Sequence, residues 1–421
     1  MPFGFYIIMA AQFFSALADN ALLIAAIAAL REMQSPPEYE PLLKTSFTLS
    51  YVVLAAFVGA FADSMPKWRV MFISNTIKIV GCAMMFFMVN PLIAYAVVGL
   101  GAAAYSPAKY GILTEYLPPR LLVVANGWIE GLTVGAIILG VLVGGLLIKP
   151  EIAHALLNFD LPVINTGIDS IGEMTIAIIG VFYLLAAVFN LYVPDTGVDH
   201  KALSKNPLYL FHEFNHCLKL LWRDRLGQIS LAVTTLFWGA GATLQFIVIK
   251  WSEIALGLDL SKSSMLQGVV AIGVAAGAVM AAKRVTLRKS VNVIPMGIAM
   301  GFIVLVMNFV TSFWIAVPLL ILIGYLSGYF VVPMNALLQH RGHILMGAGH
   351  SIAVQNFNEN LSILIMTGLY FLMMKFDFSI YTVITLFALF VAGNMYLVKL
   401  RFEANQRQHD DVAHLDDNPA H

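Results

Sequence analysis

Long apolar stretches follow one another along this chain, separated by short interruptions of proline, glycine or charge. Each stretch is about 20 residues or more, the length that a helix needs to cross the hydrocarbon core of a membrane. The pattern therefore predicts an all-α polytopic membrane protein with twelve transmembrane helices. The predicted spans are 4–30, 43–63, 69–89, 91–114, 122–148, 173–193, 227–250, 263–282, 291–310, 313–336, 349–374 and 378–400.

Composition agrees with this pattern and excludes several classes of protein. Of the 421 residues, 60% are hydrophobic and 11% are charged, whereas soluble domains average about 45–50% and about 25%. The formal net charge is zero, so there is no basic excess for nucleic acid. Cys82 lies in an apolar run and Cys217 in a predicted charged loop, which favours two unpaired thiols. The sequence shows no P-loop, GxSxG, HExxH or metal-ligand spacing, so we expect neither a cofactor nor an enzyme.

Lys and Arg are distributed unequally among the predicted loops. Because the number of spans is even, both termini lie on one side of the membrane. If that side is the cytoplasm, 16 Lys and Arg residues fall in cytoplasmic segments and six in the opposite loops. Cytoplasmic loops carry the excess of positive charge, so we predict that both termini are cytoplasmic.

The longest polar interruption divides the spans into two groups of six. We predict an N-terminal six-helix half at 1–193, a cytoplasmic linker at 194–226, a C-terminal six-helix half at 227–400 and a flexible cytoplasmic tail at 401–421. Within the linker, 211–221 is amphipathic and basic, as in helices that lie along a membrane surface. The tail histidines, His409, His414 and His421, have no metal-ligand spacing.

Matching features indicate that the two halves are pseudo-symmetric. Predicted span four holds Gly99 and Pro107, and span ten holds Gly324 and Pro333 at a similar separation. Spans five and eleven each place a carboxylate four residues after an amide. Two such six-helix halves around a central cavity are typical of secondary transporters.

Charged residues inside predicted spans are the main candidates for a site, because each costs about 2.5–3.5 kcal/mol at a helix centre. Asp19 shares one helical face with Gln12 and Ser15. We predict that Asp19 and Gln12 bind substrate; alternatively, Asp19 caps a helix or pairs with a buried lysine. Lys78, with Asn75 on its face, is predicted to be a structural countercharge.

Lys109 follows a kink-forming proline in a run of small residues that also contains Tyr105. Pro107 frees a backbone carbonyl, and a lysine just beyond it is placed to bind an anionic group. We therefore predict that Lys109 and Tyr105 contact substrate. The alternative is that Lys109 extends to the cytoplasmic face from the end of its helix.

Two further carboxylates, Glu130 and Glu359, lie on polar stripes that should face the interior of the bundle. Asn126 precedes Glu130 by four residues, and Gln355 precedes Glu359 by the same distance. We predict that Glu130, Glu359 and Gln355 bind substrate. Hydrogen bonding between helices is an equal alternative.

The loop between predicted spans two and three places Asp63 at a helix end, followed by the basic residues Lys67 and Arg69. With Glu115 and Arg120, these residues can form a charge network that breaks and re-forms, and so acts as a conformational latch. The alternative is the ordinary positive charge of a cytoplasmic loop.

This loop resembles the signature of the major facilitator superfamily, as Gly59-x3-Asp63-x3-Lys67-x-Arg69, with Pro66 where that signature usually has Gly. Longer segments, among them Gly101-Ala-Ala-Ala-Tyr-Ser-Pro-Ala-Lys-Tyr-Gly-Ile-Leu113, resemble the bacterial lysophospholipid transporter family of that superfamily. The others are 11–23, 236–241, 332–339 and 353–360, and the resemblance runs from about residue 10 to 400. Gln245 stands where that family places an arginine, and Lys250 lies five residues on, on another helical face.

The resemblance implies a major facilitator fold that works by alternating access. It implies a flippase that moves lysophosphatidylethanolamine and lysophosphatidylglycerol from the outer to the inner leaflet of the Gram-negative inner membrane. There an acyltransferase–acyl-carrier-protein synthetase would restore the missing acyl chain. The headgroup residues that the resemblance implies are Asp19 and Lys109.

Two other functions are compatible with the residues. A proton-coupled exporter of amphipathic drugs would use Asp19 or Glu130 as its proton carrier. A membrane-embedded acyltransferase would need a nucleophile and a His/Asp pair that the sequence does not show.

Overall fold

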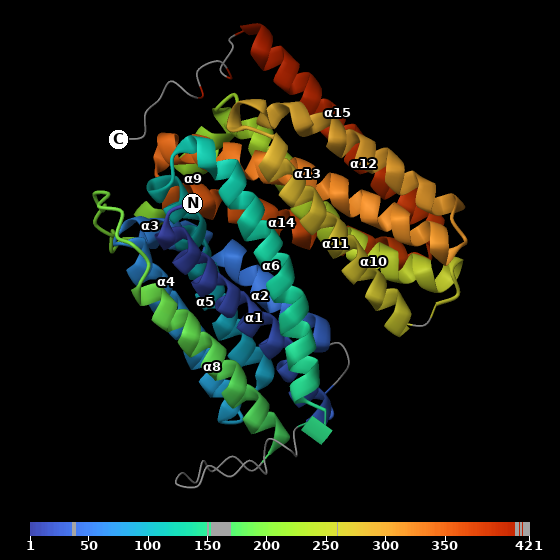
Figure 1. Cartoon of the computed structure of the whole chain (residues 1–421), viewed down its shortest axis with the longest axis horizontal. Coiled ribbons are helices and arrows are strands. Elements are labelled where there is room, and N and C mark those ends of the chain that lie inside the picture. Colours follow the sequence, from blue (N-terminus) through green and yellow to red (C-terminus); the bar gives the residue numbers. More distant parts are fainter. Residues whose placement is uncertain are drawn as a thin grey trace. The chain divides into compact units, whose positions relative to one another are not determined.

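A computed structural model shows a chain built of helices (Figure 1). The structure describes residues 1–35, 39–149, 151–152, 170–258, 260–408, 412 and 415. Within these described residues, eleven helical segments are long and apolar enough to cross a membrane, and the bent pair formed by α2 and α3 makes a twelfth if it counts as one span. The predicted all-α fold with twelve transmembrane helices is confirmed.

The helices follow the apolar stretches closely. Their bounds are α1 Phe3–Glu32, α2 Tyr39–Val53, α3 Ala55–Asp63, α4 Lys67–Phe86, α5 Pro91–Tyr116, α6 Pro119–Leu147, α8 Ile171–Leu191, α9 Pro207–Arg223, α10 Gly227–Ala255, α11 Leu260–Arg284, the 3₁₀ helix η1 Leu287–Val293, α12 Ile294–Val306, the 3₁₀ helix η2 Met307–Phe309, α13 Phe313–Met346, α14 Ala348–Lys375 and α15 Ile380–Gln408.

Three predicted spans differ in detail from the observed helices. The span 43–63 is broken at Leu54, where α2 and α3 meet at 63°. The helix α13 continues ten residues beyond the predicted end at 336, because polar side chains such as Gln339 and His340 are buried there rather than in a loop. The helix α15 runs through Arg401, where we predicted the tail to begin, and the tail histidines lie outside the described residues.

The chain forms two compact units. The first unit comprises residues 1–112 and 132–211, and the second comprises 113–131 and 212–421. Two six-helix halves with the predicted boundaries remain a prediction.

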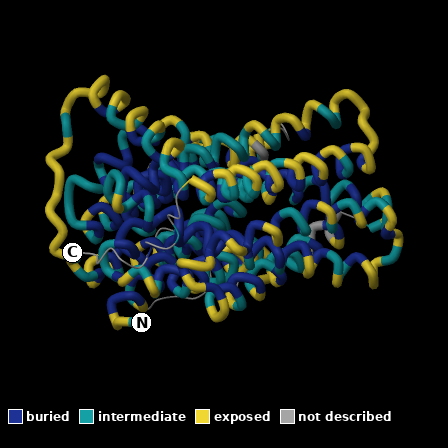
Figure 2. Tube along the Cα trace, turned by 90° about the horizontal axis from the view of Figure 1, so that it is seen from above, coloured by how far each residue is buried: buried dark blue, intermediate teal, exposed yellow. Residues whose placement is uncertain are grey.

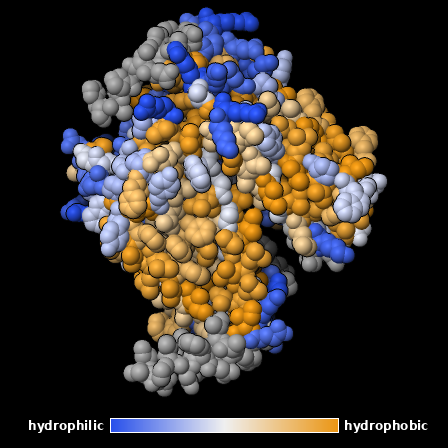
Figure 3. All heavy atoms as spheres, viewed as in Figure 1, coloured by the Kyte–Doolittle hydropathy of each residue, from blue (hydrophilic) through white to orange (hydrophobic). Residues whose placement is uncertain are grey.

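Buried and exposed stretches alternate along the helices (Figure 2). The outward face of α8 is hydrophobic, with Val181, Leu184 and Val188 about half exposed (Figure 3). Such a face suits contact with lipid.

The core of the first unit lies between α1, α4, α5 and α8. Small residues of α1, such as Ala18, Ala21 and Ala25, let the neighbouring helices approach closely. Larger side chains, including Tyr95 of α5 and Tyr183 of α8, fill the space between them. This packing brings the middle of α1 against polar residues of the other three helices.

In the second unit, α11 and α13 pack at backbone distance through glycines. A Cβ atom on Gly277 of α11 would lie 2.0 Å from the carbonyl oxygen of Tyr325, and one on Gly324 of α13 would lie 2.2 Å from that of Val270. Gly273 precedes Gly277 by four residues, and Gly328 follows Gly324 by four. This small-residue spacing is typical of closely packed membrane helices.

Replacing Gly277 by Ala should therefore destabilise the folded protein. The added methyl group would meet backbone, which cannot rotate away as a side chain can, and overpacking costs about 1–3 kcal/mol or more. We expect a lower thermal-unfolding midpoint for purified Gly277→Ala. The matched control is Gly268→Ala in the same helix, where a Cβ atom meets nothing within 4 Å. Equal midpoints for the two variants would contradict the packing.

The predicted amphipathic segment 211–221 lies within α9. Cys217 and Leu221 are buried against Leu338 of α13 and Val354 of α14. The prediction that Cys217 lies in a charged loop is wrong. The residue lies in the helix α9, on the apolar face that packs against α13 and α14, and its thiol is buried there. Asp224 follows α9, caps the first amide of α10 at Gly227 with a 2.7 Å bond, and forms an ion pair with Arg341. This end of α9 is therefore attached to α10, α13 and α14.

Candidate functional site

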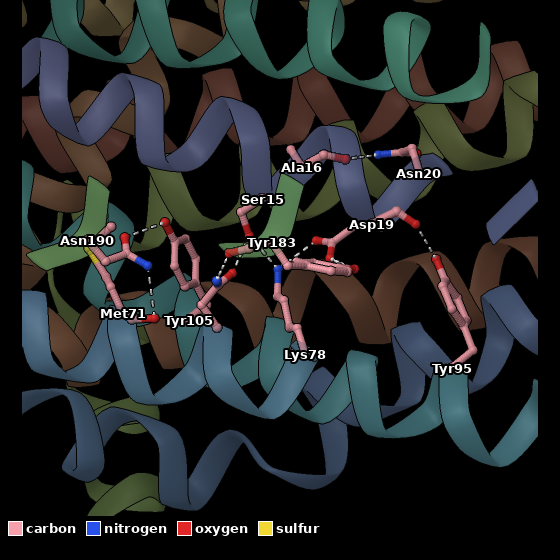
Figure 4. A network of polar contacts seen from close by, with 11 residues as sticks. Ser15, Ala16, Asp19, Asn20, Met71, Lys78, Tyr95, Tyr105, Tyr183 and Asn190 are labelled. Atoms are coloured by element: carbon pink, nitrogen blue, oxygen red, sulfur yellow. Dashed lines mark hydrogen bonds and ion pairs between the residues drawn. The ribbon is translucent and has the colours of Figure 1, made fainter. Parts of the chain in front are cut away.

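Asp19, in the middle of α1, forms a buried ion pair with Lys78 of α4 (Figure 4). The Lys78 Nζ lies 2.7 Å from Asp19 Oδ2, and the two side chains are 3% and 15% exposed. Lys78 also donates to the Ser15 hydroxyl at 3.0 Å. The structure thus brings together Asp19, Ser15 and Lys78, which the sequence had marked on two different helices.

Tyrosine and amide side chains complete this cluster. The Tyr183 hydroxyl donates to Asp19 Oδ1 at 2.7 Å, and the Tyr95 hydroxyl donates to the Asp19 carbonyl at 3.3 Å. Asn75 accepts from Ser15 at 3.2 Å and donates to the Tyr183 carbonyl at 2.7 Å. Asp19 is therefore held by groups from three other helices, which stabilises a charge at this depth.

Tyr105 of α5 extends the cluster along the same side of α4. Its ring centroid lies 5.0 Å from Lys78 Nζ, within the range of a cation–π contact. Its hydroxyl donates to Asn190 of α8 at 3.3 Å, and Asn190 donates to the Met71 carbonyl at 3.3 Å (Figure 4). The side chain of Tyr105 is buried.

Gln12 lies on the Asp19 face of α1, about two turns earlier. Its amide nitrogen donates to the Thr133 hydroxyl of α6 at 2.6 Å. Its amide oxygen is buried and accepts no hydrogen bond in the described structure. A buried acceptor of this kind costs about 1–3 kcal/mol unless a donor reaches it.

Lys109 lies in α5 one turn beyond Tyr105, with Pro107 inside the same helix as predicted. It is partly exposed, and its Nζ lies 4.1 Å from the ring centroid of Tyr110. A lysine ammonium group over an aromatic ring keeps its positive charge, the property that suits it to an anionic ligand. The charge that balances Asp19 is thus provided by Lys78, and Lys109 lies elsewhere in the same unit.

In the second unit, Glu130 and Glu359 are both buried, and hydrogen-bonded amide side chains connect their carboxyl groups. Asn335 of α13 donates to Glu130 at 3.4 Å, and Gln355 donates to Asn335 at 3.1 Å and to Glu359 at 2.8 Å. Asn126 and Gln339 exchange two hydrogen bonds of 2.9 Å nearby. These contacts join α6, α13 and α14, and substrate binding by Glu130, Glu359 and Gln355 remains a prediction.

The predicted latch residues fall in both units. Lys67 Nζ lies 2.8 Å from Asp63 Oδ1 and donates to the Ala62 carbonyl at 2.7 Å, and its side chain is 2% exposed. The Arg69 guanidinium lies 5.1 Å from the ring centroid of Trp68. Glu115 and Arg120, at the end of α5 and the start of α6, belong to the second unit. The latch remains a prediction.

Several residues of the two clusters were not predicted from the sequence. Tyr95 and Tyr183 stand in apolar runs where an aromatic residue is expected in the core, and Asn335 and Gln339 lie around the predicted end of their span. The signal that could have found them is helical spacing, since Asn335 and Gln339 are one turn apart on α13.

Comparison with known proteins places this architecture in a large class of transporters. A sequence model of the Major Facilitator Superfamily matches residues 8–367. The structure of the human organic anion transporter MFSD10 (TETRAN) superposes with a TM-score of 0.73 at 13% identity, covering 96% of this chain and all of that one. The transporter FucP in its outward conformation superposes with a TM-score of 0.70 at 14% identity, covering 95% and 98%. These structures show the major facilitator fold.

Relatives with higher sequence identity narrow the class. The chain is 42% identical to the lysophospholipid transporter LplT of Serratia proteamaculans (strain 568), over 87% of this chain and 88% of that one. It is 41% identical to LplT of Yersinia pestis (strain Pestoides F), over 87% and 86%. The chain belongs to the lysophospholipid transporter family of the major facilitator superfamily, as the sequence predicted, and it is a transporter rather than an enzyme.

Proposed function

We propose that this protein carries lysophospholipids across the bacterial inner membrane. The observation that carries the proposal is the 41–42% identity, over 87% of the chain, to two transporters named for that substrate. The proposed substrates are lysophosphatidylethanolamine and lysophosphatidylglycerol. They would move from the outer to the inner leaflet by alternating access.

The polar residues of the first unit support such a substrate. A zwitterionic or anionic headgroup that crosses hydrocarbon needs polar partners along its way, because transfer of a bare charge is prohibitive. Lys109 provides a cation for the phosphate. Asp19 and the Gln12 amide oxygen provide acceptors for a headgroup amine or hydroxyl. The single acyl chain needs only apolar surface, which the helices supply throughout.

For this proposal the orientation of the chain matters, because it defines which leaflet is the source. We propose that both termini are cytoplasmic, on the excess of Lys and Arg in the segments of that side. Alkaline phosphatase, which is active only in the periplasm, should be inactive when fused after Gln408. A fusion in the loop between α1 and α2 should be active. The reverse pattern would overturn the orientation.

The lysophospholipid that inward flipping delivers must be used by a further reaction in the inner leaflet. A lysophospholipid in the inner leaflet lacks one acyl chain, so an acyl-transfer reaction must follow if the lipid is to rejoin the bilayer. We propose that an acyltransferase–acyl-carrier-protein synthetase fills this role.

We also propose that Asp63, Lys67 and Arg69, with Glu115 and Arg120, form a charge network that holds one state of the transport cycle. The observed Asp63–Lys67 pair supports the first part of this network. Gating contacts of this type re-form as a transporter alternates between states.

Uptake of labelled lysophospholipid by spheroplasts of a strain lacking any such transporter tests the function. Expression of this chain should restore conversion of outer-leaflet lysophosphatidylethanolamine into the diacyl lipid. Uptake with and without a proton gradient, beside export of an amphipathic dye, separates the alternatives. Dye export without lysolipid uptake would mark a drug exporter and contradict the proposal.

A further inference from the structure

The amide chain in the second unit joins two buried carboxyl groups through two amide side chains. Glu130 of α6, Asn335 of α13, and Gln355 and Glu359 of α14 are each at least 94% buried. The three hydrogen bonds that the Asn335 and Gln355 amide nitrogens donate go to side-chain oxygens of Glu130, Asn335 and Glu359. The polar groups are therefore arranged around the carboxyl groups as donors.

One acceptor is left over in this arrangement. Gln355 uses its amide nitrogen twice, at 3.1 Å to Asn335 Oδ1 and at 2.8 Å to Glu359 Oε1. Its amide oxygen, Oε1, is buried and accepts no hydrogen bond in the part of the chain that the structure describes. Buried acceptors are nearly always satisfied in folded proteins, so this one calls for a donor.

A protonated carboxyl group is the donor that fits this position. An ionised carboxylate only accepts hydrogen bonds, whereas a carboxylic acid also has one O–H to donate. A primary amide and a carboxylic acid can pair through two hydrogen bonds, N–H to one carboxyl oxygen and O–H back to the amide oxygen. The first of these is present between Gln355 and Glu359, and a proton on Glu359 Oε2 would supply the second.

The groups around Glu359 also favour a proton on its carboxyl group. On the elements packed around it, the described groups that act on its carboxyl are Gln355 of its own helix, the Thr234 hydroxyl of α10 and the Glu130 carboxyl of α6. Two of these are neutral and the third is acidic. A metal cation would need amide oxygens turned toward the carboxylates, whereas here the amide nitrogens point at them.

We propose that Glu359 is a proton-binding site, with its carboxyl group protonated at neutral pH and paired with the Gln355 amide. The proton would fix the Gln355 amide, whose nitrogen also bonds to Asn335 of α13, so its loss would loosen this contact between α14 and α13. This inference goes beyond the transported substrate and does not depend on which lipid is carried. The transport cycle would then sense pH through a carboxyl group that is none of the headgroup contacts proposed for the first unit.

Infrared difference spectroscopy on the purified full-length protein tests this site without any transport measurement. A protonated buried carboxyl group gives a carbonyl stretching band that disappears when the group ionises. The unmodified protein should show such a band at neutral pH and lose it on alkaline titration. Glu359→Gln should lack the band, and Asp195→Asn, at an exposed position, should keep it.

A second variant keeps the test sharp if Glu359→Gln folds poorly. Gln355→Met removes the amide partner, so the band should persist but shift in frequency. Absence of the band from the unmodified protein at neutral pH would overturn the proposal, as would an unchanged band in Glu359→Gln.

Discussion

Lys109→Ala should lose transport of every lysophospholipid, whatever its headgroup. All such lipids carry a phosphate, and a hydrogen bond to a charged group contributes about 1.5–3 kcal/mol, which corresponds to a loss of about 10- to 150-fold. The effect should appear in initial flipping rates at low substrate concentration. Lys109→Arg, which keeps the charge but changes its shape, should retain part of the activity.

A matched control separates phosphate binding from general loss of positive charge. The Lys399 side chain of α15 is 40% exposed and lies 3.8 Å from Glu403, so Lys399→Ala removes one positive charge from the second unit and leaves Lys109 unchanged. It should transport normally, because an exposed ion pair contributes little. Full activity of a well-folded Lys109→Ala would remove the phosphate assignment and leave Lys109 as a lysine that extends to the cytoplasmic face.

Lys78→Met should destabilise the protein strongly, because it leaves Asp19, whose side chain is only 15% exposed, without its ion-pair partner. Breaking a buried pair from one side typically costs about 3–5 kcal/mol. Asp19→Asn should be milder, since the amide oxygen can still accept from Lys78 while the amide nitrogen donates to the Tyr183 hydroxyl, which can also accept. The double variant Asp19→Asn/Lys78→Met should recover much of the thermal stability that Lys78→Met loses, because no buried charge is then unpaired.

Transport by the same variants separates a structural pair from a headgroup contact. If Asp19 binds the headgroup amine, Asp19→Asn should impair lysophosphatidylethanolamine more than lysophosphatidylglycerol, which has no amine. The double variant should then fold but still discriminate poorly between the two lipids. Equal losses for both lipids in folded Asp19→Asn would assign Asp19 to the ion pair alone. An additive loss of stability in the double variant would contradict the coupling between the two charges.

The sequence predicted the spans well because membrane helices must be apolar over a fixed length. It also identified Asp19 and Lys78, since a charged residue inside a span costs free energy and is therefore rare unless it has a role. It did not show that the two form a pair, because that depends on how α1, α4 and α8 pack. Tyr183 was missed for the same reason, as a tyrosine in an apolar run gives no sign of its hydrogen bond.

The second cluster shows where span boundaries misled the prediction. Glu130 and Glu359 were found from their spacing to amides, but Asn335 and Gln339 lie around the predicted end of the tenth span. Polar residues near a span's end look like the start of a loop. The helix instead continues to Met346 because these side chains bond to α6 and α14. Local polarity could not predict partners that are more than 200 residues away in the chain.

Reconstituted lipid flipping tests the central claim most directly. The purified protein is placed in liposomes whose outer leaflet holds fluorescent lysophosphatidylethanolamine, lysophosphatidylglycerol or the corresponding diacyl lipids, and a membrane-impermeant quencher reports the fraction that moves inward. Both lysolipids should become protected in protein-containing vesicles, and the diacyl lipids should remain accessible. Equal movement of lysolipids in vesicles with and without protein, or equal movement of diacyl lipids and lysolipids, would contradict the account.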